Sequence, residues 1–272
     1  MSTVIASEAN PGRENEDCAV GGPELVVVVD GAGTPKRLDT GCVHGTAWYA
    51  RRLALAMYDE AVDGTDGLAD GLATAIERTA RRHAGSCDLG DPMTPSATVA
   101  VLRVRQQEQR LEWLVLADAT VALDLPTGPL TASDHRVSEL TRAQRVELAE
   151  VLAPLDPVAR LDTLVRAQRS MMNVHGGYWV AAADPKAAGE ALTGSVPLAE
   201  VGLAAALSDG AARLVDDFGV MGWPGLLALL AAEGPAELIA RTRAAERSDP
   251  DGLRWPRGKR HDDATAAIVR LG

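Results

Sequence analysis

Residues 25–31 have the sequence LVVVVDG, and this stretch decides the fold. Five consecutive apolar residues between Pro23 and an Asp-Gly pair are typical of a short buried strand that ends in a turn. The residues that follow, 43–61 and 68–79, repeat apolar side chains at helical spacing. The sequence therefore predicts one buried strand followed by two amphipathic helices.

More strands are expected along the rest of the chain. Segments 96–104 and 111–117 are apolar and are joined by a polar turn, which predicts a hairpin. Segment 120–125 is expected to continue this hairpin as a meander. Three further strands are predicted at 178–183, 201–208 and 264–271.

Helices are predicted between these strands. Pro185, Pro224 and Pro235 are each expected to lie at the start of a helix. Residues at about 134–175 form a variable, Arg-rich helical segment that prolines interrupt. Blocks of helices between hairpin-linked strands favour an α+β layered sandwich over a doubly wound parallel sheet. Because no linker or internal repeat is evident, we expect one domain over residues 1–272.

The composition excludes several classes of partner. The chain of 272 residues carries 27 Lys and Arg against 38 Asp and Glu, and its net charge of −11 disfavours binding to nucleic acid or to an anionic membrane. No apolar run reaches about 18 residues and the N-terminus is polar, so we expect a cytoplasmic protein. The cysteines (Cys18, Cys42 and Cys87) form no CxxC pair, and the histidines show no HExxH spacing. Any metal site is therefore expected to use oxygen ligands.

Three aspartates share one context, because each lies at the edge of an apolar strand. Asp30 follows residues 25–29, Asp209 follows 201–208, and Asp262 precedes 264–271. One Asp-Gly pair after a strand indicates no more than a turn. Three carboxylates at strand ends can converge, and hard oxygen ligands of this kind suit Mg²⁺ or Mn²⁺.

Six short motifs, in the same order along the chain, resemble those of the type 2C (PPM) serine/threonine protein phosphatases. The resemblance spans nearly the whole chain, and the Ala-, Arg- and Gly-rich composition is typical of a GC-rich bacterial genome, so we expect a divergent bacterial, actinobacterial, member. The family patterns are Arg-x-x-x-Glu-Asp, Asp-Gly-x-Gly, Gly-Ala/Ser-Thr, Gly-Asp-Ser-Arg, Ser-Asp-Gly and Asp-Asn-x-Thr. The matching residues are 12–17 (GRENED), 30–33 (DGAG), 96–98 (SAT), 117–120 (ADAT), 208–210 (SDG) and 262–265 (DDAT).

The resemblance implies a four-layer α-β-β-α sandwich with a metal centre between its sheets. Asp30 would bridge two Mg²⁺ or Mn²⁺ ions, and the carbonyl of Gly31 would bind one of them. Asp209 and Asp262 would complete the ligands of the other ion. The resemblance further implies that Glu16 or Asp17 would hold metal-bound waters, that Asp118 with Asp209 would support a third ion, and that Arg13 would bind the substrate phosphate.

The resemblance also implies a mechanism and partners. Water that bridges two cations would attack phosphorus directly, so no protein nucleophile is required. The expected substrate is a phosphorylated protein, and a cognate serine/threonine kinase is the expected regulatory partner.

The sequence departs from the family pattern at several motif positions. Ala32 stands where many relatives have a histidine proposed as general acid, and loss of such a group typically costs ~10²–10⁴ in rate. Ala117 and Thr120 replace the Gly and Arg of the fourth motif. Arg13 is one residue closer to Glu16 than in the usual spacing, and Asp263 replaces Asn.

Two alternatives remain open from the residues alone. The stretch 26–34 also resembles the opening of the haloacid-dehalogenase phosphatases, in which Asp30 would be a covalent nucleophile. Alternatively, Ala32 and the altered fourth motif favour a catalytically weak or inactive phosphatase-like domain that binds a phosphorylated partner.

The remaining polar residues are interpreted as structural. Arg166 and Arg169 are expected on a solvated helix face, with phosphopeptide binding as the alternative. Cys42 and His44 have no third partner that would indicate a nucleophile. A basic cluster before Asp262 is expected to offset nearby acids rather than to form a rim for an anionic substrate; it contains Arg254, Arg257, Lys259 and Arg260.

Overall fold

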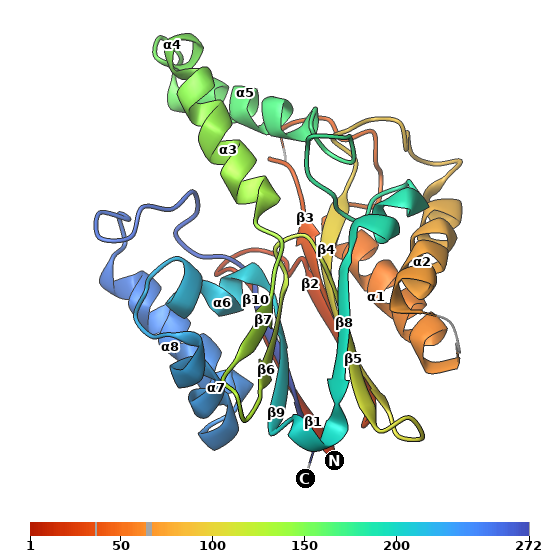
Figure 1. Ribbon diagram of the computed structural model, residues 1–272. Helices are drawn as coiled ribbons and strands as arrows, with labels where there is room; N and C mark the ends of the chain where they lie inside the picture. The colour runs from red at the N-terminus through yellow and green to blue at the C-terminus, as the bar shows by residue number, and fades with distance from the viewer. Residues whose placement is uncertain (36, 64–66, 272) are drawn as a thin grey trace.

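The computed structural model describes residues 1–35, 37–63 and 67–271 as two antiparallel sheets packed face to face between layers of helices (Figure 1). This arrangement confirms the predicted α-β-β-α sandwich. In spatial order, the first sheet contains β2 (Asp17–Gly21), β3 (Leu25–Ala32), β4 (Ser96–Arg105), β5 (Arg110–Leu116) and β8 (Leu192–Pro197). The second contains β1 (Ser2–Glu8), β10 (Ala264–Arg270), β9 (Leu203–Leu207), β6 (Thr120–Asp124) and β7 (Leu130–Ala132).

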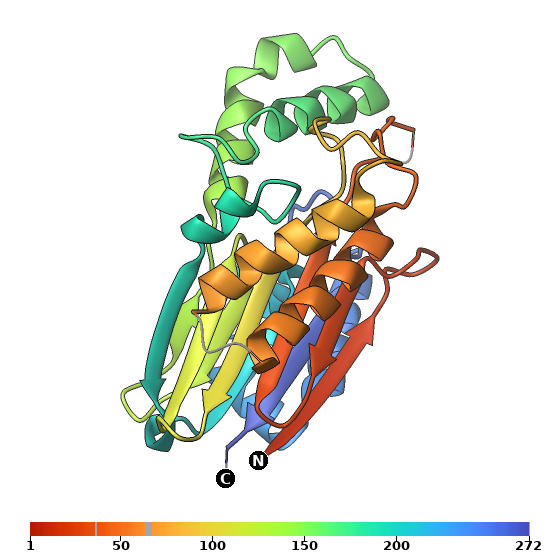
Figure 2. The same cartoon turned by 90° about the vertical axis from the view of Figure 1, so that its right-hand side faces the viewer.

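Strand β3 is covered on both faces, which explains its unbroken apolar sequence. Val27 and Val29 pack under α1 (Thr46–Asp63) and α2 (Leu68–His83). Val26 and Val28 pack between the two sheets. A strand that is buried on both faces has no solvated side, so polar and apolar residues do not alternate along it. Figure 2 shows the two helices lying across this sheet.

Three C-terminal helices cover the outer face of the second sheet. They are α6 (Asp209–Asp216), α7 (Trp223–Ala232) and α8 (Pro235–Ser248), and a proline lies in the first turn of both α7 and α8, as predicted. Leu207 and Ile268 pack under these helices, whereas Ala204 and Ala206 face the first sheet. Small alanine side chains on the inner face allow the two sheets to approach closely.

The prediction that 120–125 continues the hairpin as a meander is wrong. β6 belongs to the second sheet, and residues 117–119 carry the chain across from β5 in the first. Ala117 makes this crossing with a φ of 64°, in the left-handed region that favours glycine. The local turn, rather than the apolar pattern of either strand, therefore decides which sheet β6 joins.

The predicted strand at 178–183 is also absent. In this segment Ala181 exchanges two backbone hydrogen bonds with Ala97, of 2.8 and 2.9 Å, but no ladder forms. Every strand pair among the described sheets is antiparallel. This pairing excludes the parallel sheet that a haloacid-dehalogenase phosphatase would require.

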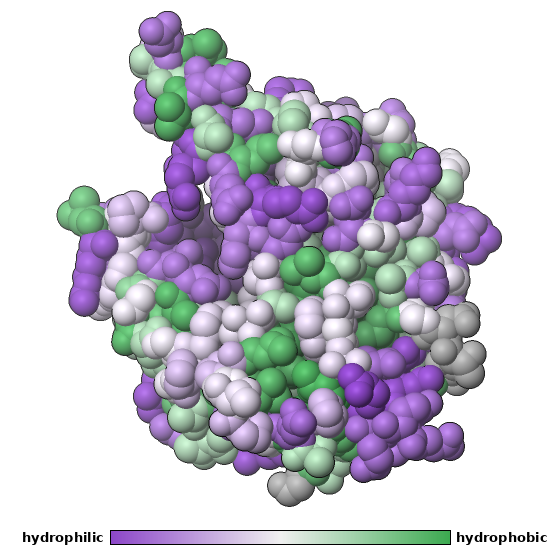
Figure 3. Space-filling model, in the orientation of Figure 1, coloured by the Kyte–Doolittle hydropathy of each residue, from purple (hydrophilic) through white to green (hydrophobic). Residues whose placement is uncertain are grey.

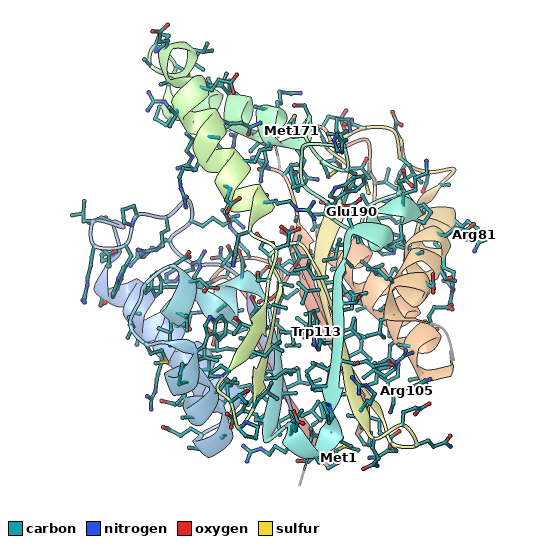
Figure 4. The ribbon with its side chains drawn as sticks, viewed as in Figure 1. Met1, Arg81, Arg105, Trp113, Met171 and Glu190 are labelled. Atoms are coloured by element: carbon teal, nitrogen blue, oxygen red, sulfur yellow. The ribbon has the colours of Figure 1, made fainter. Side chains whose placement is uncertain are left out.

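The helical segment predicted at 134–175 forms a projection beyond one end of the sheets. It contains α3 (Arg136–Glu147), α4 (Ala149–Leu152) and α5 (Pro157–Arg169). A small apolar cluster with Tyr178 and Val180 at its centre joins it to the body, and Met171, labelled in Figure 4, packs against that cluster. Arg136 adds an ion pair of 3.7 Å to Glu190 in the 3₁₀ helix Pro185–Glu190. Of the helices in the described ranges, none has the length and apolarity needed to cross a membrane.

Candidate metal centre

The predicted acidic residues meet at one end of the two sheets. Asp17 and Asp30 are directly opposite each other in β2 and β3. Asp118 lies two residues before Thr120, which pairs with Leu207, itself two residues before Asp209. The antiparallel register thus brings side chains from four strand ends to the same edge. Figure 3 shows a hydrophilic hollow over this end of the sheets, between α3 and the loop that follows α8.

Burial and mutual repulsion raise the pKa of the central carboxyls. Burial is the larger cause at Asp30, and the charges of Asp17, Asp209, Asp262 and Asp118 raise its pKa further. The pKa of Asp17 is raised to about 7 by burial, although the nearby hydroxyl groups of Thr265 and Ser208 partly oppose this shift. The pKa of Asp118 is raised to about 7 by burial and by the charge of Asp209. These carboxyls therefore lie close enough to resist simultaneous ionisation.

Asp262 differs from its neighbours because basic side chains already contact it. Its Oδ2 accepts a hydrogen bond of 3.1 Å from Arg213, and its Oδ1 accepts one of 2.9 Å from Lys259. Burial lowers the pKa of Lys259, but the charges of Asp262, Asp209 and Asp30 outweigh it and raise the pKa. Although the Lys259 side chain is 61% exposed, its ammonium group lies at the edge of the carboxylate cluster. The expectation that this basic segment offsets nearby acids is met here.

Tight backbone packing holds the motifs in place. Asp263 accepts hydrogen bonds from the backbone N–H groups of Asn10 (2.6 Å) and Glu16 (2.8 Å), so it ties the N-terminal motif to β10. A side chain at Gly210 would begin 1.9 Å from the carbonyl oxygen of Asp263. At Gly31 it would begin 2.6 Å from the carbonyl oxygen of Glu16. Both glycines are therefore required by close packing around the acidic cluster.

The structure thus brings together most of the predicted site residues. Asp17, Asp30, Asp118, Asp209 and Asp262 form the cluster, with Glu16 and Gly31 at its edge. Arg13 lies in the same N-terminal loop and has an exposed side chain. Its contact with a phosphate remains a prediction.

The residues present fit a divalent cation. Asp17 is 8% exposed, and among the described residues neither of its carboxylate oxygens has a hydrogen-bond partner of good geometry. In the part of the chain that the structure describes, the five aspartates of the cluster face two basic side chains, Arg213 and Lys259. Arg213 is also paired with Glu246 at 2.7 Å. Buried carboxylates in such excess are costly unless a cation binds them, and an all-oxygen donor set suits Mg²⁺ or Mn²⁺.

The cluster should make the metal-free protein less stable as the pH rises. An unfolded Asp titrates near 3.8, whereas folded Asp17 and Asp118 titrate near 7, so the folded state binds more protons between these values. The free energy of unfolding should therefore fall from pH 4 to pH 7. Urea unfolding at several pH values, with and without manganese, measures this slope, and manganese should flatten it. An Asp17→Asn variant should show a smaller slope, and an identical slope would contradict the assignment.

A pocket of about 630 Å³ opens beside the cluster. Glu16 and Thr46 line it at the end nearest the carboxylate cluster, and Arg37, Cys42 and His44 line it further out. Arg37 also forms an ion pair with Asp162 of α5, so the helical projection borders this pocket.

Arg169 is a structural residue whose role the sequence did not reveal. The prediction of a solvated face is wrong for Arg169, which is 5% exposed, and right for Arg166, which is exposed. Arg169 donates hydrogen bonds to the carbonyl oxygen of Ala32 (2.5 Å) and to Ser96 Oγ (2.9 Å). It therefore joins the end of α5 to the DGAG motif. No local pattern distinguishes Arg169 from Arg166.

Replacing Arg169 with Met should destabilise the protein. The variant removes the charged donor from the Ala32 carbonyl and the Ser96 hydroxyl, which keep a mutual contact of 3.4 Å. A hydrogen bond to a charged group contributes ~1.5–3 kcal/mol. Arg166→Met, on the exposed side of the same helix, should change stability by less than ~0.5 kcal/mol. Urea denaturation compares the two variants, and equal effects would show that the Arg169 contacts are unimportant.

No family model matches the sequence, and no curated protein is significantly similar to it. Solved structures do resemble the whole chain. Serine/threonine phosphatase Stp1 from Staphylococcus aureus has a TM-score of 0.60 at 12% identity, covering 99% of this chain and 94% of Stp1. PppA, a regulatory component of the type VI secretion system of Pseudomonas aeruginosa, has a TM-score of 0.59 at 17% identity, covering 100% of this chain and 97% of PppA.

The catalytic domain of the phosphatase PstP, solved with two manganese ions, is similar as well. Its TM-score is 0.55 at 16% identity, covering 98% of this chain and 96% of that domain. At these identities the likeness establishes the fold. The chain thus has the fold of the PPM-type serine/threonine phosphatases, as the motifs predicted.

Proposed function

We propose that this chain is a divalent-metal-dependent phosphate monoester hydrolase that removes phosphate from serine and threonine residues of cytoplasmic proteins. The observation that carries the proposal is the convergence of five aspartates at one end of the two sheets of a PPM-type fold, where burial and mutual repulsion raise the pKa of Asp17, Asp30, Asp118 and Asp209. The whole chain, 1–272, would act as one phosphatase domain.

The acidic residues would hold two Mg²⁺ or Mn²⁺ ions. Asp30 would bind both ions, because its carboxylate faces Asp17 in the first sheet and Asp209 and Asp262 in the second. The Gly31 carbonyl, Asp209 and Asp262 would complete their ligands, Glu16 and Asp17 would support them, and Asp118 with Asp209 offers a third position. Bound divalent ions would supply the positive charge that activates water and neutralises the phosphoryl oxygens.

The other residues of the chain bind and orient the substrate in this proposal. Arg13, exposed at the rim, would donate a charge-assisted hydrogen bond to the phosphate. Ala32 supplies no acid group, so the leaving oxygen would take its proton from water. The pocket beside Glu16 would accept the flanking peptide. A serine/threonine kinase that phosphorylates the same protein is the expected counterpart.

A second candidate function rests on the contacts of Asp262. Arg213 and Lys259 already neutralise this carboxylate, and they would compete with an ion at that position. A chain with weak metal binding and no acid at Ala32 could bind a phosphorylated partner and hydrolyse it slowly. The two functions share one site and differ in rate.

An assay with an aryl phosphate and then with phosphopeptides separates the two functions. The leading proposal expects turnover that manganese activates and that a chelator abolishes. It also expects no hydroxylamine-sensitive phosphate on Asp30 after rapid acid quench, because water attacks phosphorus directly. Phosphopeptide binding without turnover in saturating manganese would favour the binding domain, and activity that survives complete chelation would contradict both.

A further inference from the structure

Two cysteines and two histidines meet at one point outside the carboxylate cluster. The ligand atoms of Cys42, His44, His83 and Cys87 all lie within 4.8 Å of one another. Cys42 Sγ is 2.8 Å from His83 Nε2, and His44 Nδ1 is 3.3 Å from Cys87 Sγ. The sequence shows no such site, because these residues come from two segments about 40 positions apart. The expectation that any metal site uses only oxygen ligands does not account for them.

The distances match one tetrahedral ion. With Zn–S bonds of about 2.3 Å and Zn–N bonds of about 2.0–2.1 Å, tetrahedral ligands lie about 3.3–3.8 Å from each other. The contact of 2.8 Å is about 0.5 Å shorter than this range and the contact of 3.3 Å lies at its lower end. The other ligand atoms lie within 4.8 Å of one another, so they would have to move closer by about 1.5 Å at most. Two thiolates and two imidazoles form the donor set that selects zinc over the hard cations of a carboxylate centre.

A backbone N–H group is directed at each of the two sulfur atoms. The backbone N–H of Val43 lies 3.3 Å from Cys87 Sγ, and that of His44 lies 3.3 Å from Cys42 Sγ. N–H donors directed at sulfur favour the charged, metal-binding form of the thiol. His83 is 1% exposed, and the ring of Trp48 stacks on His44 at 4.1 Å, so an apolar shell fixes both imidazoles.

We propose that Cys42, His44, His83 and Cys87 bind one structural zinc ion. All four positions are then filled by the protein, as in closed structural sites rather than catalytic ones. The ion would fasten the segment before α1 to the end of α2. Cys42 and His44 line the pocket beside Glu16, so zinc would set the shape of one wall of the substrate groove.

A disulfide between Cys42 and Cys87 is the competing explanation. It would use both sulfurs but would leave the two convergent imidazoles without a role. All three cysteines of the chain are free in the structure. Zinc accounts for all four side chains at once, and this favours it.

Metal analysis of the full-length chain tests the proposal. We expect one zinc per chain after purification without added metal, and a tetrahedral thiolate spectrum after cobalt exchange. Cys87→Ser should weaken zinc binding by more than ~100-fold, because even a residue that only supports a metal ligand contributes ~10–100-fold. Cys18→Ser is the matched control. Because Cys18 lies outside the cluster, this variant should still bind one zinc ion per chain.

The same metal analysis distinguishes the proposed zinc site from the proposed metal site at the carboxylate cluster. Asp30→Asn should keep its zinc, since its ligands are elsewhere, even if the proposed phosphatase function is wrong. An unchanged zinc affinity in Cys87→Ser, or loss of zinc from Asp30→Asn, would overturn the assignment. So would a Cys42–Cys87 disulfide in zinc-free protein that fails to bind zinc after reduction.

Discussion

Asp30→Asn should lower the phosphatase activity by more than ~100-fold, because even residues that only support a metal ligand contribute ~10–100-fold. Asp30 is the carboxylate that faces the acidic groups of both sheets, so its loss removes the anchor common to the proposed ions. The rate of aryl phosphate hydrolysis in saturating manganese measures this effect. Asp124→Asn, an exposed carboxylate at the end of β6, should keep the normal rate.

The same variant should respond differently to metal in a stability measurement. At a manganese concentration 100 times the dissociation constant, the parent chain should gain ~2.7 kcal/mol of stability, and Asp30→Asn should gain little. Without metal, Asp30→Asn should be the more stable protein near neutral pH, because one repelling buried carboxylate is gone. A variant with normal activity and a normal manganese shift would remove Asp30 from the site.

Glu246→Ala should have the largest effect on folding, ~3–5 kcal/mol. Glu246 in α8 is fully buried and accepts hydrogen bonds from Arg213 (2.7 Å), Arg243 (2.9 Å) and His261 (2.6 Å). Removing it leaves two arginines in the interior without this carboxylate, and breaking such a buried pair costs far more than the pair itself contributes. The loss is a large part of a typical stability of ~5–15 kcal/mol.

Urea unfolding of Glu246→Ala and Glu237→Ala tests this expectation. Glu237 lies in the same helix and pairs with Arg241 at 2.9 Å, but both side chains are exposed, so its loss should cost less than ~1 kcal/mol. Because Arg213 also contacts Asp262, Glu246→Ala should in addition weaken manganese binding. Equal costs for the two variants would show that the buried network adds no stability.

The sequence by itself was sufficient wherever local burial or local turn chemistry decided the structure. The run at residues 25–29 predicted β3 because both of its faces are covered, and Pro224 and Pro235 predicted the starts of α7 and α8. Asp30, Asp209 and Asp262 could be named because each is adjacent to an apolar strand, whereas Asp17 and Asp118 were named only through the resemblance of their motifs. The edge strand β1 was missed because most of its residues are exposed, so no alternation marks it.

Only the tertiary structure decided which separate segments meet. The left-handed turn at Ala117 sends β6 into the second sheet, and the register of that sheet then places Asp118 beside Asp209. The cluster of Cys42 with His83, and the contact of Arg169 with Ala32, likewise join segments more than 40 residues apart. Periodicity reports whether a residue is buried, because burial repeats with the local backbone. Which partner it meets depends on long-range packing, which no local pattern records.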